Sequence, residues 1–229
     1  MVESPCLRLA HRGDWRHAAE NTVAAFLAAL EIPGCDGVEL DVRAARDGTP
    51  VVIHDATLER VQGRPGRVED LTVYELADAG VPTLAEVLEA LPRHAFLDVE
   101  LKADVAPAAV AVLAGARGAD LGRGVVASFE PAYLERVGRL APAWPRWLIS
   151  DDLETATIRS AVELGCVAIA AGWRVIDRAA MVKTRAAGLG VAGWTVRRRP
   201  TADRLARLGA IAVCVEGAAL DRPAGMVPA

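Results

Sequence analysis

Residues 38–42 read VELDV, an apolar run in which two carboxylates, Glu39 and Asp41, alternate with aliphatic residues. Alternate residues of a β-strand point to the same face, so the two acids share one side of a predicted strand. A buried carboxylate is costly unless a cation or strong hydrogen bonds compensate it. The run therefore predicts a strand that either ends at an exposed face or meets a positive partner there.

Similar short apolar runs recur along the whole chain. With the first one included they are CLRLA (6–10), DGVELDV (36–42), AFLDVEL (95–101), GVVASF (124–129), RWLIS (146–150), CVAIAA (166–171), GVAGWTV (190–196) and IAVCVEG (211–217). Segments with helical spacing lie between most of them. Alternating strands and helices predict a parallel sheet, and eight such units suit a closed (β/α)8 TIM barrel in which residues 1–229 form a single domain.

A doubly wound open sheet is the alternative architecture. Such sheets usually begin with a Gly-rich phosphate loop, whereas the first run here continues into AHRGDW. The closed barrel is the better interpretation.

The interval between the second and third runs is about twice as long as the others and contains Asp47-Gly48, a strong hairpin signal. We expect the second strand to extend beyond the barrel mouth and residues 49–55, TPVVIHD, to return antiparallel to it. A turn centred on Asp47-Gly48 would place Asp41 opposite His54.

Composition and charge favour a soluble globular protein. The 52% apolar and 24% charged residues are near the globular average, and the net charge of -4 indicates no nucleic-acid partner. The N-terminus has no basic leader before an apolar stretch, and no long apolar run suggests stable membrane insertion, so a cytoplasmic location is expected. The four cysteines form no C-x-x-C pair, and nothing indicates an oligomeric state.

Charged residues gather where the first three predicted strands end, which is the active-site face of a (β/α)8 barrel. They are His11 and Arg12, Glu39 and Asp41, and Asp98, Glu100 and Lys102, with His54 and Asp55 added by the hairpin. Oxygen ligands without thiolates suit one hard divalent cation, Mg²⁺ or Ca²⁺. Arg12 and Lys102 suit a phosphate oxygen, and two histidines can serve as general acid and base, so the set predicts phosphoester cleavage.

The motifs H-R-G, E-L-D-V, V-x-H-D and E-L-K carry these residues in order. Together with GRVEDLTVYEL, VPTLAEVLEAL and AGWTV, they resemble the glycerophosphodiester phosphodiesterase family over nearly the whole chain. The resemblance implies a (β/α)8 barrel that hydrolyses small glycerophosphodiesters to glycerol 3-phosphate and an alcohol with a divalent cation.

The resemblance also implies roles for individual residues. Glu39, Asp41 and Glu100 would hold the cation, His11 and His54 would form the acid–base pair, and Arg12 and Lys102 would bind phosphate. The neighbouring glycerol hydroxyl would act as nucleophile and give a cyclic phosphate, which water then opens. Phe129 and Trp194, at strand ends, either pack under the glycerol or close the barrel top.

Three features depart from the family pattern. The connection at 77–80 is only ADAG, where the family usually has a longer insertion; Arg197 stands where Asn is usual; and Val215-Glu216 is the nearest match to a common Thr-Asp-x-Pro motif. A short insertion makes an open mouth plausible, which keeps a lysophospholipase D-like activity as an alternative.

A non-catalytic barrel that binds a phosphorylated ligand is a further alternative. Such a barrel would not need two histidines, which argues against it.

Several residues have a structural interpretation that needs no catalytic role. Asp98 lies deeper than Glu100 and is expected to support the site by hydrogen bonding. Residues 20–22 could contact the site, although a helix cap fully explains Asn21. Neither His17 nor His94 is expected at the site.

Overall fold

Eight parallel strands form a closed ring in the computed structural model, which describes residues 6–118 and 121–221. The start of the N-terminal stretch lies outside these residues. The ring closes because β1 pairs with both β2 and β9. Its strands are β1 (Leu7–His11), β2 (Gly37–Ala44), β4 (Phe96–Leu101), β5 (Gly124–Ser128), β6 (Arg146–Ser150), β7 (Ala168–Gly172), β8 (Gly190–Val196) and β9 (Ala212–Val215). The (β/α)8 barrel is confirmed.

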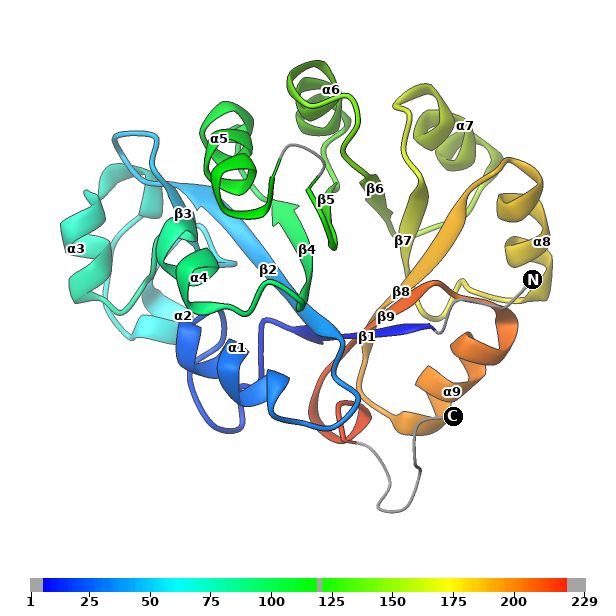
Figure 1. Ribbon diagram of the computed structural model, residues 1–229, viewed down its shortest axis with the longest axis horizontal. Helices are drawn as coiled ribbons and strands as arrows, with labels where there is room; N and C mark the ends of the chain where they lie inside the picture. The colour runs from blue at the N-terminus through cyan, green and yellow to red at the C-terminus, as the bar shows by residue number, and fades with distance from the viewer. Residues whose placement is uncertain (1–5, 119–120, 222–229) are drawn as a thin grey trace.

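Helices surround the strands on the outside (Figure 1). Between successive barrel strands lie α1 (Val23–Leu30), α5 (Ala106–Arg117), α6 (Pro131–Leu140), α7 (Thr155–Glu163), α8 (Arg178–Ala186) and α9 (Arg199–Leu208). The long second interval adds β3 (Pro50–Val52), α2 (Glu59–Gln62), the 3-10 turn η1 (Val68–Asp70), α3 (Val73–Asp78) and α4 (Leu84–Ala90), and η2 (Gly217–Ala219) follows β9. Within the described residues, no helix is long and apolar enough to cross a membrane.

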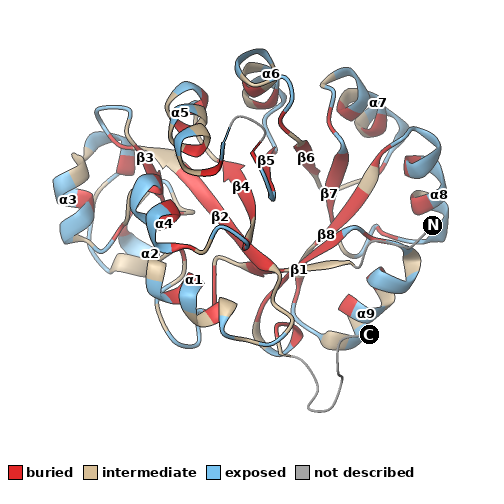
Figure 2. Cartoon of the chain, in the orientation of Figure 1, coloured by how far each residue is buried: buried red, intermediate tan, exposed pale blue. Residues whose placement is uncertain are grey.

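The two faces of β2 have different environments, as its alternating sequence predicts. Val38, Leu40 and Val42 are fully buried in the apolar layer between the strands and the helices. Glu39 and Asp41 project from the opposite face, into the barrel. A second apolar cluster with small alanines and Trp147 fills the barrel interior, and Figure 2 shows that burial follows the strands and the inner sides of the helices.

The predicted hairpin is present, but its register differs by one residue. Val42 pairs with Val52, and the Ile53 amide donates to the carbonyl of Asp41 at 2.9 Å, so Asp41 faces Ile53 and not His54. The Ala45 amide closes the loop by donating to the carbonyl of Thr49 at 2.9 Å. Three residues therefore form the loop tip, with Gly48 at a φ of 84°, instead of the two-residue turn assumed from Asp47-Gly48.

Gly37 is required where β2 packs against β4. A Cβ at this position would lie 2.1 Å from the carbonyl oxygen of Phe96, its partner on β4. The clash is with backbone that is fixed by the strand ladder. Gly37→Ala should therefore destabilise the protein by about 1–3 kcal/mol or more, which lowers the melting temperature by roughly 2–4 °C per kcal/mol at this chain length.

Gly115→Ala provides the matched control, because a Cβ there meets nothing within 4 Å and lies inside α5. This change should leave the melting temperature unchanged or raise it, because alanine favours helix. Equal melting temperatures for the two variants, followed by circular dichroism, would contradict the close packing at Gly37.

Candidate active site

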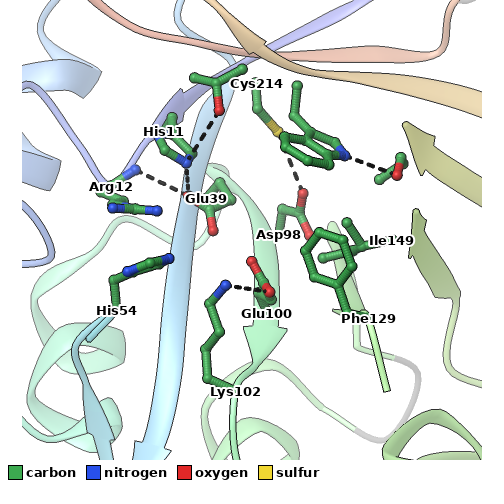
Figure 3. Close-up of a pocket in the computed structure, with 13 residues that line it drawn as sticks. His11, Arg12, Glu39, His54, Asp98, Glu100, Lys102, Phe129, Ile149 and Cys214 are labelled. Atoms are coloured by element: carbon green, nitrogen blue, oxygen red, sulfur yellow. Dashed lines mark hydrogen bonds and ion pairs between the residues drawn. The ribbon is translucent and has the colours of Figure 1, made fainter. Parts of the chain in front are cut away.

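A cavity of about 250 Å³ opens at the carboxyl ends of the barrel strands. Most of the predicted site residues line it: His11, Arg12, Glu39, His54, Glu100, Lys102, Phe129 and Trp194. In the view of Figure 3, Arg12 lies between the two imidazoles, and Glu39 and Glu100 face them. Asp41 is fully buried and is not among the residues that line the cavity. The structure thus brings these predicted residues together around one cavity.

Glu39, Asp41 and Glu100 form a compact acidic triad, with one carboxylate oxygen from each lying within 4.8 Å of the others. Burial and the neighbouring Asp41 carboxylate raise the pKa of Glu39 well above its usual value and that of Glu100 to about 7. The pKa of Asp41 is lowered, because Arg12 and Lys102 outweigh the effect of its burial. Three acids at such close range favour a bound cation.

The donor set fits a hard divalent cation. Asp41 Oδ1 is buried and has no hydrogen-bond partner among the described residues, and the Lys102 ammonium lies 3.6 Å away. A buried carboxylate oxygen without a partner is costly and suits a metal ligand. The three carboxylates supply only oxygen, which Mg²⁺ and Ca²⁺ prefer over the nitrogen and sulfur that zinc favours.

Asn21 holds Asp41 in place, a site contact that the sequence interpretation passed over in favour of a helix cap. Its amide nitrogen donates to Asp41 Oδ2 at 2.7 Å, and its Oδ1 accepts from the Asp41 amide at 3.2 Å. The predicted helix cap at Asn21 is wrong, because Thr22 accepts from Ala25 and caps α1. Asn tolerates the left-handed backbone found here, with a φ of 59°, which turns its side chain inward.

Arg12 and Lys102 lie against the acidic triad from two sides. Arg12 Nε lies 3.1 Å from Asp41 Oδ2, and its Nη1 donates to Glu20 at 3.0 Å. Lys102 Nζ lies 2.6 Å from Glu100 Oε1. Both cations have their own carboxylate partners, so they are fixed at the cavity wall, where a phosphate oxygen could reach them.

The two histidines each have a carboxylate at Nδ1. His54 Nδ1 lies 2.6 Å from Asp55, and Asp55 accepts from Arg60. Burial lowers the pKa of His54 below its usual value, although Asp41 and Asp55 oppose that change. His11 Nδ1 lies 3.4 Å from Glu216. An imidazole held at one nitrogen presents the other in a fixed direction.

Phe129 and Trp194 form an apolar wall of the cavity. Their rings meet edge to face, with centroids 5.6 Å apart and an interplanar angle of 78°. The Trp194 indole donates to the carbonyl of Ala170 at 2.9 Å, and Lys102 lies 5.7 Å from the Phe129 centroid. Such a wall can contact the carbon atoms of a small polar substrate.

Other residues lie beside the triad or away from it. Asp98 lines the cavity and accepts from Cys214 Sγ at 3.6 Å, and burial raises its pKa to about 8. His17 contacts Asp14 outside the cavity, and His94 is exposed. Arg197 donates to Glu216, and neither residue lines the cavity.

Divalent cations should stabilise the folded protein through the acidic triad. A cation present at about 100 times its Kd adds about 2.7 kcal/mol if it binds only the native state. For a chain of this length we expect the melting temperature to rise by roughly 5–10 °C in Mg²⁺ or Ca²⁺ and to return with EDTA. Differential scanning calorimetry at matched ionic strength measures this rise, and equal melting temperatures in divalent and monovalent salt would contradict it.

The fold and the site define an α/β barrel with an acidic, histidine-flanked cavity at the face where such barrels carry their active sites. Residues 11–220 match the family model described as "Glycerophosphoryl diester phosphodiesterase family". The chain belongs to this family.

Individual relatives share this similarity to different extents. A glycerophosphodiester phosphodiesterase of Caldanaerobacter subterraneus is 42% identical over 113 residues, which are 43% of this chain and 46% of the relative. The match thus spans about half the length of that relative. A Bacillus subtilis glycerophosphodiester phosphodiesterase is 26% identical over 90% of this chain and 82% of its own length.

A solved structure extends the comparison to the fold. The Oleispira antarctica phosphodiesterase, in complex with the product sn-glycerol-3-phosphate, superposes with a TM-score of 0.83. It is 27% identical, and the match covers 92% of this chain and 93% of the other.

Proposed function

We propose that this chain is a divalent-cation-dependent phosphodiesterase that hydrolyses glycerophosphodiesters to glycerol 3-phosphate and an alcohol. The observation that carries the proposal is the convergence of the Glu39, Asp41 and Glu100 carboxylates with two histidines in one cavity. Family membership and the product bound to the Oleispira relative support the same chemistry.

The proposed reaction uses one histidine as a base and the other as an acid. A base removes the proton from the glycerol 2-hydroxyl, whose oxygen forms a bond to phosphorus as the bond to the alcohol oxygen breaks. The acid protonates the departing alkoxide. Water then opens the resulting cyclic phosphate, with the two histidines exchanging duties.

The environment of each histidine supports an assignment. Burial lowers the pKa of His54, so its imidazole is neutral near pH 7 and can accept the first proton. His11 lies beside Glu39 and Thr195 and would protonate the alcohol. Arg12 and Lys102 would bind the phosphate oxygens, and Phe129 and Trp194 would contact the glycerol carbons.

The cation would be held by Glu39, Asp41 and Glu100. Mg²⁺ and Ca²⁺ both suit this oxygen set. When bound, the cation would neutralise phosphate charge and polarise the phosphorus. The protein's own contribution is to keep the three carboxylates buried and oriented, with Asn21 and Arg12 fixing Asp41.

Cavity size favours a small substrate over a lysophospholipid. About 250 Å³ is below the range of roughly 300–1,000 Å³ usual for drug-sized ligands, and it accommodates a glycerol phosphate more readily than a long acyl chain. Choline release from glycerophosphocholine and from lysophosphatidylcholine tests this choice in Mg²⁺ and in Ca²⁺. We expect glycerophosphocholine to have the higher kcat/KM, and the opposite order would favour the lysophospholipase D-like alternative.

We further propose that residues 1–229 act as a single domain. The expected cytoplasmic location stays a prediction.

A further inference from the structure

Glu216 lies directly after β9 and beside the last residue of β1. These two strands are neighbours in the closed barrel, with Ala10 paired to Val215, so the next residues along each strand are His11 and Glu216. Glu216 Oε1 lies 3.4 Å from His11 Nδ1, and only 7% of Glu216 is exposed. The carboxylate therefore faces the imidazole from a buried position.

Two further donors fix this carboxylate. The Trp15 indole donates to Glu216 Oε2 at 3.1 Å, and Arg197 donates to Oε1 at 3.3 Å. Trp15 follows β1 and Arg197 follows β8, so the two carboxylate oxygens accept hydrogen bonds from two separate segments of the chain. The contact with His11, assisted by Arg197, outweighs burial and lowers the pKa of Glu216 to about 2. Glu216 is thus a charged, acceptor-only group at neutral pH.

The opposite nitrogen of His11 faces the cavity. His11 Nε2 lies 3.9 Å from Glu39 Oε2 and 3.5 Å from the Thr195 hydroxyl. An ionised carboxylate can only accept a hydrogen bond, so a neutral imidazole beside it carries its proton on Nδ1. In this neutral form Nε2 presents a lone pair on the cavity side, as His11 needs when it takes a proton from water in the second half of the proposed reaction. In the first half the imidazolium also carries a proton on Nε2 and can give it to the alcohol.

We propose that Glu216 is a positioning residue that selects the Nδ1–H tautomer of His11, so that Nε2 exchanges the proton during phosphodiester cleavage. This inference rests on the proposed function of His11. The same arrangement occurs at His54, whose Nδ1 lies 2.6 Å from Asp55. The carboxylate partners of the two histidines come from different parts of the sequence. Asp55 directly follows His54, whereas Glu216 is separated from His11 by almost the whole barrel.

The tautomer of His11 can be measured without an activity assay. In protein labelled with ¹⁵N-histidine, the His11 signal is assigned by its loss in His11→Ala. At a pH where His11 is neutral, the wild-type protein should show a protonated Nδ1 and a bare Nε2. Glu216→Leu replaces the hydrogen-bond acceptor by an apolar side chain of similar size. This change should shift the population of neutral His11 towards the Nε2–H tautomer.

Kinetics provide the second readout. If the wrong tautomer dominates, kcat should fall by about 10²–10⁴, the range associated with general acid–base catalysis and its orienting carboxylates, with little change in KM. In a His11→Ala background, Glu216→Leu should cause no further loss, because the residue acts through that imidazole. Glu163→Gln, at the exposed end of α7, serves as the control and should match the wild type.

Circular dichroism shows whether the Glu216→Leu variant is folded. Glu216→Gln keeps the shape of the side chain and so separates the loss of the carboxylate from a loss of packing. A folded Glu216→Leu variant that keeps the Nδ1–H tautomer would overturn the inference. An equal loss of kcat in the wild-type and His11→Ala backgrounds would also overturn it. If no glycerophosphodiester is cleaved but the tautomer still depends on Glu216, the proposed function fails and the positioning of His11 stands.

Discussion

Glu100→Gln should abolish tight cation binding and lower kcat/KM by about 10³-fold or more, because losing a metal ligand removes several kcal/mol of charge stabilisation and each 1.36 kcal/mol is a factor of ten. Glu100 is buried and contributes one of the three clustered oxygens. An amide of the same shape keeps one carbonyl oxygen but removes the negative charge. Isothermal titration with Mg²⁺ and Ca²⁺ measures the affinity directly.

Asp104→Asn is the matched control for this variant. Asp104 follows β4 within a few residues of Glu100, but it is exposed and pairs with Arg136 on the outside of the barrel. Its cation affinity and turnover should equal those of the wild type. Retention of wild-type cation affinity by a folded Glu100→Gln variant would place the cation elsewhere.

His11→Ala and His54→Ala should each lower kcat by about 10²–10⁴, the range for loss of a general acid or base. Both side chains line the cavity, whereas Arg12, Lys102 and the acidic triad remain in place in either variant. Binding of glycerol 3-phosphate should therefore persist, which separates a loss of chemistry from a loss of binding. Stopped assays measure kcat, and isothermal titration calorimetry with glycerol 3-phosphate measures binding of the product.

The chain offers a natural control for these substitutions. His94 is exposed and lies away from the cavity, so His94→Ala should retain full turnover. Near-wild-type rates in both cavity variants would exclude an acid–base role for His11 and His54.

The barrel could be predicted because each strand carries its own signal. Every barrel strand overlaps one of the short apolar runs, and alternation within VELDV separates the outward Leu40 from the inward Glu39 and Asp41. The rule that barrel sites gather at strand ends then brought the acids and the histidines together. These inferences depend on local pattern and on one general property of the fold.

The errors arose where local sequence allows two structures. Asp47-Gly48 is compatible with a two-residue turn and with a longer loop, and the difference shifts the partner of Asp41 by one residue. Asn21 can cap a helix or adopt a left-handed backbone and bind Asp41, and tertiary contact decides between them. The proximity of Glu216 to His11 follows from barrel closure, a signal that was available once the first and last strands were taken as neighbours.

We expect this cavity to cleave a glycerophosphodiester on the alcohol side of the phosphate with the help of a divalent cation. ³¹P nuclear magnetic resonance of glycerophosphocholine, incubated with the protein and either Mg²⁺ or Ca²⁺, follows the phosphorus directly. We expect conversion to glycerol 3-phosphate with release of choline, and no conversion in EDTA. Formation of phosphocholine, or an unchanged substrate signal with both cations, would contradict it.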